Sequence, residues 1–176
     1  EIGSRYKLIE DISKQENLSI SILDIKNFSD VNDFFGYKIG DYILKLVAKR
    51  IEELVIKKPN YSVYRLTSDV FAILASNESK VDFIKNIKEI SKIISSKAIR
   101  AKGREVFVSI NYTFSFEPKN SLLETANVIR KYSKTNPNQI IYDRSLEIEK
   151  DYEKNIFWTL KIKKALENND IIPYYQ

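Results

Sequence analysis

The stretch RLTSDVFAIL, residues 65–74, decides the fold. A short polar run, Thr67-Ser68-Asp69, separates apolar residues on either side of it. Two apolar segments joined by a few turn-forming residues predict a β-hairpin, here with strands at 62–66 and 70–75. Asp69 would then lie in the turn of this hairpin.

Upstream of the hairpin lies the segment LDIKNFSDVNDFFGYKIGD, residues 23–41. Residues 18–25 alternate apolar and small polar side chains and predict a strand with Asp24 near its C-terminal end. Residues 31–35 predict a short helical turn closed by Gly36. Asp41 is expected to cap a helix that continues to about Val55.

Downstream, the helical period predicts helices at 81–94 and 122–134, and residues 4–14 predict one near the start of the chain. Residues 105–116 are apolar and aromatic and predict a long central strand, paired with 98–101 across Lys102-Gly103. A short strand is expected at 139–142. The order β–α–α–β–β–α–β predicts an α+β, ferredoxin-like fold, with helices packed on a central, mostly antiparallel sheet.

Both quoted segments resemble the motifs of GGDEF domains, the diguanylate cyclases. The resemblance covers roughly residues 3–143 and implies the palm-like fold of that family. The upstream matches are Asp24, Phe28, Asn32, Asp33, Gly36, Gly40 and Asp41, while Lys26 and Ser29 depart from the motif. In the hairpin, Asp69 and Phe71 are kept, Thr67 and Ser68 replace two glycines, and Val70 replaces a glutamate.

The resemblance implies a metal site. Joining two GTP molecules requires attack of a hydroxyl on a phosphate, with Mg²⁺ clamping the phosphates. By resemblance, Asp24 and Asp69 occupy the two carboxylate positions that hold the metal, and the backbone carbonyl of Ile25 assists. The two carboxylates are then expected close enough to share a cation. In the alternative reading, Asp24 only ends a strand and Asp69 only fills a turn.

The resemblance also implies a nucleotide site. Asn32 and Asp41 match the positions that recognise the guanine edge, and Lys134 matches a phosphate contact. Phe28, from the same motif, is also expected among the nucleotide-binding residues. Binding that prefers GTP over ATP and depends on Mg²⁺ is therefore expected. The alternatives are a helix cap for Asp41 and a local turn bond for Asn32.

The departures from the family pattern affect catalysis. Valine at position 70 can neither bind a metal nor accept a proton, Ser29 replaces a phosphate-contacting lysine, and an arginine is missing from residues 133–138. Because several contributions to transition-state stabilisation are lost together, we do not expect an active cyclase. Lys58 and Tyr61 stand at the two ends of the family's product-inhibition motif, Arg-x-x-Asp, so feedback by cyclic di-GMP is not expected there.

Residues 160–176 resemble the opening helix and first strand of an EAL domain, the cyclic di-GMP phosphodiesterase. The predicted organisation is a degenerate GGDEF domain at 1–144, a stiff connector helix at 145–169 and the first EAL strand at 170–176. The apolar stripe of this helix also fits packing on its own domain. The absence of methionine favours an internal fragment of a GGDEF–EAL tandem.

Composition limits the classes of protein to which the chain can belong. The 176 residues are 43% hydrophobic and 30% charged, as in globular proteins, and the lack of cysteine excludes disulfides. No apolar run is long enough for a membrane span, so the cytoplasm is the expected compartment, or the cytoplasmic portion of the protein if its full length carries a membrane anchor upstream. The formal net charge of +5 comes from lysines opposite apolar stripes, which is typical of solvated helix faces and not of a nucleic-acid interface.

The sequence therefore predicts a catalytically impaired GGDEF domain in cyclic di-GMP signalling, which senses GTP or acts as a scaffold for an attached phosphodiesterase. The expected partners are GTP, the EAL domain in cis and a second copy of the chain. The alternatives are a weakly active diguanylate cyclase and a purely structural dimerisation module. Whether the full-length protein is a phosphodiesterase is left open, because the catalytic residues of an EAL domain lie outside this sequence.

Overall fold

The computed structural model describes residues 2–101, 103–146, 148–168 and 170. The chain divides into two compact units, Glu1–Tyr142 and Asp143–Gln176. The first unit contains the sheet and five of the described helices, and the second contains one long helix.

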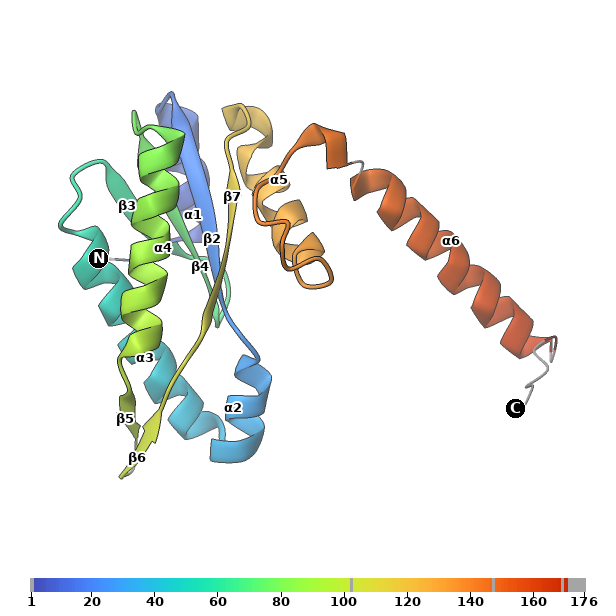
Figure 1. Ribbon diagram of the computed structural model, residues 1–176, viewed down its shortest axis with the longest axis horizontal. Coiled ribbons are helices and arrows are strands. Elements are labelled where there is room, and N and C mark those ends of the chain that lie inside the picture. Colours follow the sequence, from blue (N-terminus) through green and yellow to red (C-terminus); the bar gives the residue numbers. More distant parts are fainter. Residues whose placement is uncertain (1, 102, 147, 169, 171–176) are drawn as a thin grey trace. The chain divides into compact units, whose positions relative to one another are not determined.

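A five-stranded sheet forms the centre of the first unit, in the order β1-β3-β4-β2-β7 (Figure 1). All neighbouring strands pair antiparallel except β1 with β3. The prediction of a mostly antiparallel sheet is therefore confirmed. The strands are β1 (Gly3–Ser4), β2 (Leu18–Ile25), β3 (Tyr61–Arg65), β4 (Val70–Ser76) and β7 (Ile110–Ser115).

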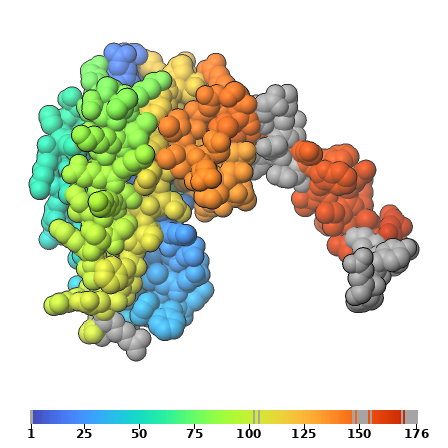
Figure 2. Space-filling model, in the orientation of Figure 1, coloured from blue at the N-terminus to red at the C-terminus, as the bar shows by residue number. Residues whose placement is uncertain are grey.

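Helices cover both faces of this sheet, and in the space-filling view the green α4 residues hide much of one face (Figure 2). They are α1 (Arg5–Lys14), α2 (Phe28–Phe35), α3 (Tyr37–Val55), α4 (Lys80–Ser96) and α5 (Lys119–Tyr132). Alternate residues of a strand point to opposite faces. Leu23 and Phe71 thus join the core beneath α3 and α4, while Ile22 and Val70 join the core beneath α1 and α5.

The hairpin around residues 67–69 forms as predicted. Arg65 pairs with Phe71, and Val63 with Ile73. Among the described residues, positive φ is found at three asparagines and two glycines and not within 67–69. Threonine and serine are therefore accommodated in this turn without backbone strain.

The predicted central strand at 105–116 is wrong in two respects. The chain forms a separate ribbon, β5 (Ile99–Ala101) with β6 (Arg104–Val106), and returns to the main sheet only at β7. Within the main sheet β7 lies at an edge, next to β2. The reason is that pairing across Lys102-Gly103, which was predicted correctly, occupies β6 in its own two-stranded sheet.

Three smaller predictions are also corrected. Asp41 does not cap its helix, because α3 already begins at Tyr37 and Gly36, at φ 80°, holds the capping position. The turn expected at 31–35 is a helix of eight residues. Residues 139–142 form no strand, only a single parallel bridge from Ile141 to Phe114.

The described residues of the second unit form a 3₁₀ turn, Arg144–Leu146, and α6 (Ile148–Glu167). A helix is thus present where a connector was predicted, although its connecting role stays a prediction. Residues 171–176, on which the first EAL strand was predicted, lie outside the described residues. In the part of the chain that is described, no helix combines the length and the apolar character needed to cross a bilayer.

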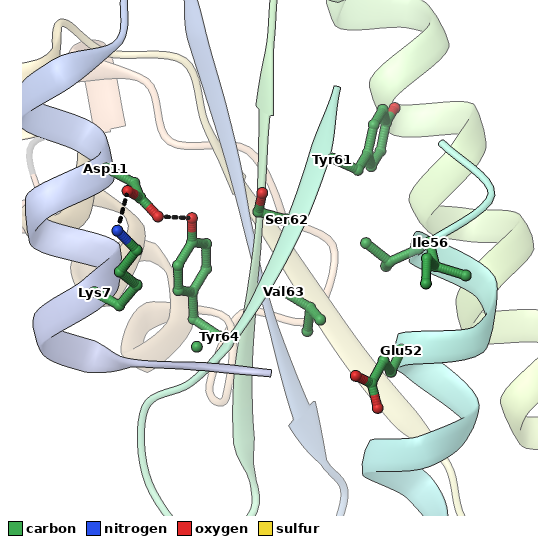
Figure 3. Close-up of a pocket in the computed structure, with 10 residues that line it drawn as sticks. Lys7, Asp11, Glu52, Ile56, Tyr61, Ser62, Val63 and Tyr64 are labelled. Atoms are coloured by element: carbon green, nitrogen blue, oxygen red, sulfur yellow. Dashed lines mark hydrogen bonds and ion pairs between the residues drawn. The ribbon is translucent and has the colours of Figure 1, made fainter. Parts of the chain in front are cut away.

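The edge of the sheet near β1 borders a pocket of about 280 Å³, lined in part by Lys7, Asp11 and Tyr64 (Figure 3). The hydroxyl of Tyr64 donates a hydrogen bond to Asp11 at 2.7 Å, and Lys7 pairs with the same carboxylate at 3.1 Å. Burial, followed by the bond donated to Asp11, raises the pKa of Tyr64 well above its ordinary value. The folded chain therefore holds this proton more tightly than the unfolded chain does.

A pH dependence follows from this shift. Above a pH of about 10, tyrosine ionises in the unfolded chain while Tyr64 stays protonated in the fold, so the free energy of unfolding should fall. Tyr64→Phe should be less stable at neutral pH but should lose less stability between pH 10 and 12. Urea unfolding across this range measures the slopes, with exposed Tyr6→Phe as the control. Identical slopes for both variants would contradict the assignment.

Candidate functional site

The candidate site lies where three strands end together. Asp24, the penultimate residue of β2, is paired with Val70 of β4 on one side and with Asn111 of β7 on the other. The amide of Ile25 donates to the carbonyl of Asp69 at 3.1 Å. The backbones of the two predicted metal-binding aspartates are therefore adjacent.

The side chain of Asp24 is buried on the α5 face of the sheet and is paired with two cations. Its Oδ2 atom accepts a hydrogen bond from Nη1 of Arg130 at 2.8 Å. The Nζ atom of Lys134 lies 3.7 Å from the same oxygen. Both basic residues come from the C-terminal end of α5 and the turn that follows it. In this structure, Lys134 therefore contacts a predicted metal ligand.

The carboxylate of Asp69 has partners within its own turn. The Oδ1 atom accepts a hydrogen bond from the hydroxyl of Ser68 at 3.0 Å and a long one from Thr67 at 3.5 Å. Arg65 donates to the carbonyl oxygens of Thr67 and Ser68. The residues that replace the two glycines thus hold the aspartate by hydrogen bonds.

A divalent cation bound by Asp24, the Ile25 carbonyl and Asp69 is the arrangement that the sequence predicted. Among the described residues, no three acidic side chains gather into a metal-binding cluster. Mg²⁺ requires near-octahedral oxygen ligands and usually keeps several waters. As arranged here, the residues do not fit such an ion, because Arg130 and Lys134 already place two positive charges beside the carboxylate of Asp24. The ligand set itself stays a prediction.

The predicted guanine contacts lie together at the junction of α2 and α3. The amide oxygen of Asn32 lies so close to Gly40 that a Cβ atom there would be 1.9 Å from it. Asp41 follows Gly40 and is exposed, so its carboxylate is free of the capping role and available to a ligand. Phe28 is buried in the core below them, which makes it a support for this corner.

The other positions that depart from the family pattern place no side chain at the carboxylate of Asp24. Val70 is 5% exposed and packs in the apolar core beneath α1 and α5. Ser29 is exposed at the start of α2. Lys58 and Tyr61, at the place of the product-inhibition motif, both bond to Asn86 of α4, at 2.8 and 2.9 Å. They belong to a structural cluster.

Sequence reasoning missed Arg130. It lies 106 residues from Asp24 along the chain, so no local motif joins them. The available signal was its spacing of four residues from Lys134, because residues four apart lie on one face of a helix. Arg130 shares one face of the helix predicted at 122–134 with Lys134, a predicted site residue, and this pairing was the clue.

Comparison with known proteins agrees with this architecture. The model of the family "Diguanylate cyclase, GGDEF domain" matches residues 6–134. Among curated relatives, the chain is 27% identical to the cyclic di-GMP phosphodiesterase PdeB of Shewanella oneidensis over 97% of this chain, and 29% identical to diguanylate cyclase A of Treponema denticola over 74% of it. The matched region spans 20% and 36% of those two proteins.

Solved structures show the same fold. The GGDEF domain of DgcB from Caulobacter crescentus, in complex with c-di-GMP, is similar with a TM-score of 0.68 and 19% identity, covering 80% of this chain and 90% of that one. The GGDEF domain of YfiN from Pseudomonas aeruginosa is similar with a TM-score of 0.67 and 22% identity, covering 77% of this chain and 92% of that one. On the family match over most of its length, this chain belongs to the GGDEF domain family of cyclic di-GMP signalling.

Proposed function

We propose that this GGDEF domain is a regulatory module, which binds guanine nucleotides without converting them to cyclic di-GMP. Nucleotide binding would change the activity of an attached phosphodiesterase domain. The relative PdeB supports the second part, because it is named a phosphodiesterase and its similarity to this chain covers nearly all 176 residues. The chain itself spans a fifth of that protein, so the tandem is part of the proposal.

The observation that carries the proposal is the place of Val70. It is the cross-strand partner of Asp24. By resemblance to GGDEF domains, a glutamate at this position would act on the reacting hydroxyl. Instead, its side chain is buried in an apolar cluster that also contains Leu122 and Ala126 of α5. A general base must lie within hydrogen-bond reach of the proton that it removes. At this position the chain offers no group that can accept a proton.

The guanine corner supports the binding half of the proposal. An amide can both donate and accept hydrogen bonds, and a carboxylate can accept two from the Watson–Crick edge of guanine. Asn32 and Asp41 provide this pair at one corner of the fold, and Gly40 leaves the space in which the Asn32 amide lies. Adenine presents the opposite pattern on that edge, so this corner should discriminate between the two bases.

Calorimetric titration tests the proposal. We expect GTP to bind at least about tenfold more tightly than ATP, the effect of losing one or two hydrogen bonds. Asp41→Ala should remove this preference. Gly40→Ala should also weaken GTP binding, because its Cβ forces Asn32 to move, while alanine in a helix preserves the fold.

The matched control is Asp30→Ala, which removes an exposed carboxylate from the first turn of α2 and should leave GTP binding unchanged. Equal affinity for GTP and ATP, or an Asp41→Ala variant that binds like the unaltered chain, would favour a structural module that takes no nucleotide.

A further inference from the structure

The cluster around Asp24 differs from the cation site that GGDEF chemistry requires. We propose that the guanidinium of Arg130 is a built-in counter-ion, which takes the place of a divalent metal at Asp24 and keeps such ions out. This exclusion of metal ions is a property of the free chain and does not depend on nucleotide binding. Three observations carry it: charge, space and burial.

The charges around Asp24 oppose a second cation. Arg130 and Lys134 both contact Oδ2, at 2.8 and 3.7 Å, so two positive charges face one negative charge. The three groups together keep one net positive charge. A divalent ion approaching Asp24 would meet repulsion from both basic side chains, and repulsion is strong at distances of about 4 Å in partly buried surroundings.

The hollow beside Asp24 is too small for a hydrated ion. Asp24, Asn111, Thr113, Arg130 and Lys134 line a hollow of about 10 Å³ together with Ile22. That volume is close to the minimum for a single water molecule. Nε of Arg130 and Oγ1 of Thr113 are both buried without a protein partner. The hollow therefore has room for about one water molecule, whereas Mg²⁺ with several waters would not fit without displacing the arginine.

Burial fixes the pair in place. The side chains of Asp24 and Arg130 are 10% and 20% exposed, so water screens their attraction far less than at the surface. The arginine emerges from α5, a helix anchored in the core by Leu122, Ala126 and Ile129. A metal that displaced the guanidinium from Asp24 would leave the mostly buried charge of Arg130 without its partner, and the binding of the metal would have to offset that cost.

The test is to titrate the nucleotide-free chain with Mn²⁺ and to measure binding from the electron paramagnetic resonance signal of free Mn²⁺. The unaltered chain should show no saturable binding at millimolar Mn²⁺. The double variant Arg130→Met/Lys134→Met frees Asp24 and should bind at least about tenfold more tightly, since one removed unit charge at this range is worth more than that factor. Adding Asp24→Asn to the double variant should abolish the gain.

Two controls make the outcome specific. Arg130→Lys keeps the charge and should still exclude Mn²⁺. Arg100→Met removes the same charge from an exposed side chain that pairs with Glu105, and should behave like the unaltered chain. Equal binding by the unaltered chain and the double variant, or a gain that survives Asp24→Asn, would overturn the proposal.

A second measurement needs only the unaltered chain and Asp24→Asn. An ion that binds the folded state raises the midpoint of urea unfolding. We expect the unaltered chain to have the same unfolding midpoint in millimolar Mg²⁺ as in the presence of a chelator. A rise that Asp24→Asn removes would show that a metal binds at Asp24 despite Arg130, and would overturn the proposal even if the double variant did not fold.

Discussion

Phe114→Ala is expected to lower the free energy of unfolding by about 3–5 kcal/mol, the range for removing a large aromatic side chain from a core. Phe114 is fully buried in β7. Its ring packs against Phe83 of α4 at 6.0 Å, against Tyr112 at 5.7 Å and against Phe116 at 6.2 Å between centroids. Alanine would leave a cavity at the point where the edge strand meets the helix layer.

Urea unfolding followed by circular dichroism measures this loss. The matched control is Phe107→Ala, which removes the same ring from a side chain that is 63% exposed between β6 and β7. Its effect should stay within about 0.5 kcal/mol, as for ordinary surface substitutions. Equal losses for the two variants would mean that the aromatic cluster does not anchor β7 to α4.

Asp24→Asn is expected to destabilise the chain by about 2–3 kcal/mol in the presence of chelator, because it leaves the buried part of Arg130 without a negative charge. Arg130→Met should cost less, since Lys134 lies 3.7 Å from Asp24 and can still neutralise it. The asymmetry between the two variants is the informative quantity. It arises because the cluster holds two cations and one anion.

The opposite sign is expected of a carboxylate kept only for metal binding. Without its ion, such a group is an uncompensated buried charge, and replacing it by asparagine should stabilise the fold. Urea unfolding of both single variants and of the double variant Asp24→Asn/Arg130→Met measures the coupling between the two groups. A stabilising Asp24→Asn, or single effects that add without coupling, would contradict the ion pair.

Sequence periodicity predicted most of the first unit. The strand at 18–25 was placed correctly because its residues alternate between two covered faces and a polar turn follows it. The hairpin around Thr67 was found from its polar interruption, and the ribbon across Lys102-Gly103 from its turn residues. These are local patterns, which depend on neighbours within a few positions.

What the sequence could not reveal depends on partners far along the chain. The position of β7 at the edge follows from which strand β2 pairs with, and strand order is not encoded in the apolar pattern of a single segment. The ion pair between Asp24 and Arg130 joins β2 to α5 in the same way. Asp41 has a capping residue type in a plausible position, but Gly36 ends α2 and α3 begins directly after it.

Cyclic di-GMP synthesis by this chain is the decisive quantity for a GGDEF domain without a proton acceptor at position 70 and with an arginine on Asp24. The chain is incubated for a long period with GTP and Mg²⁺ or Mn²⁺, and the nucleotides are separated by chromatography. We predict no cyclic di-GMP above the level of an Asp24→Ala control. Product that accumulates with the unaltered chain and not with Asp24→Ala would contradict a non-catalytic, regulatory role.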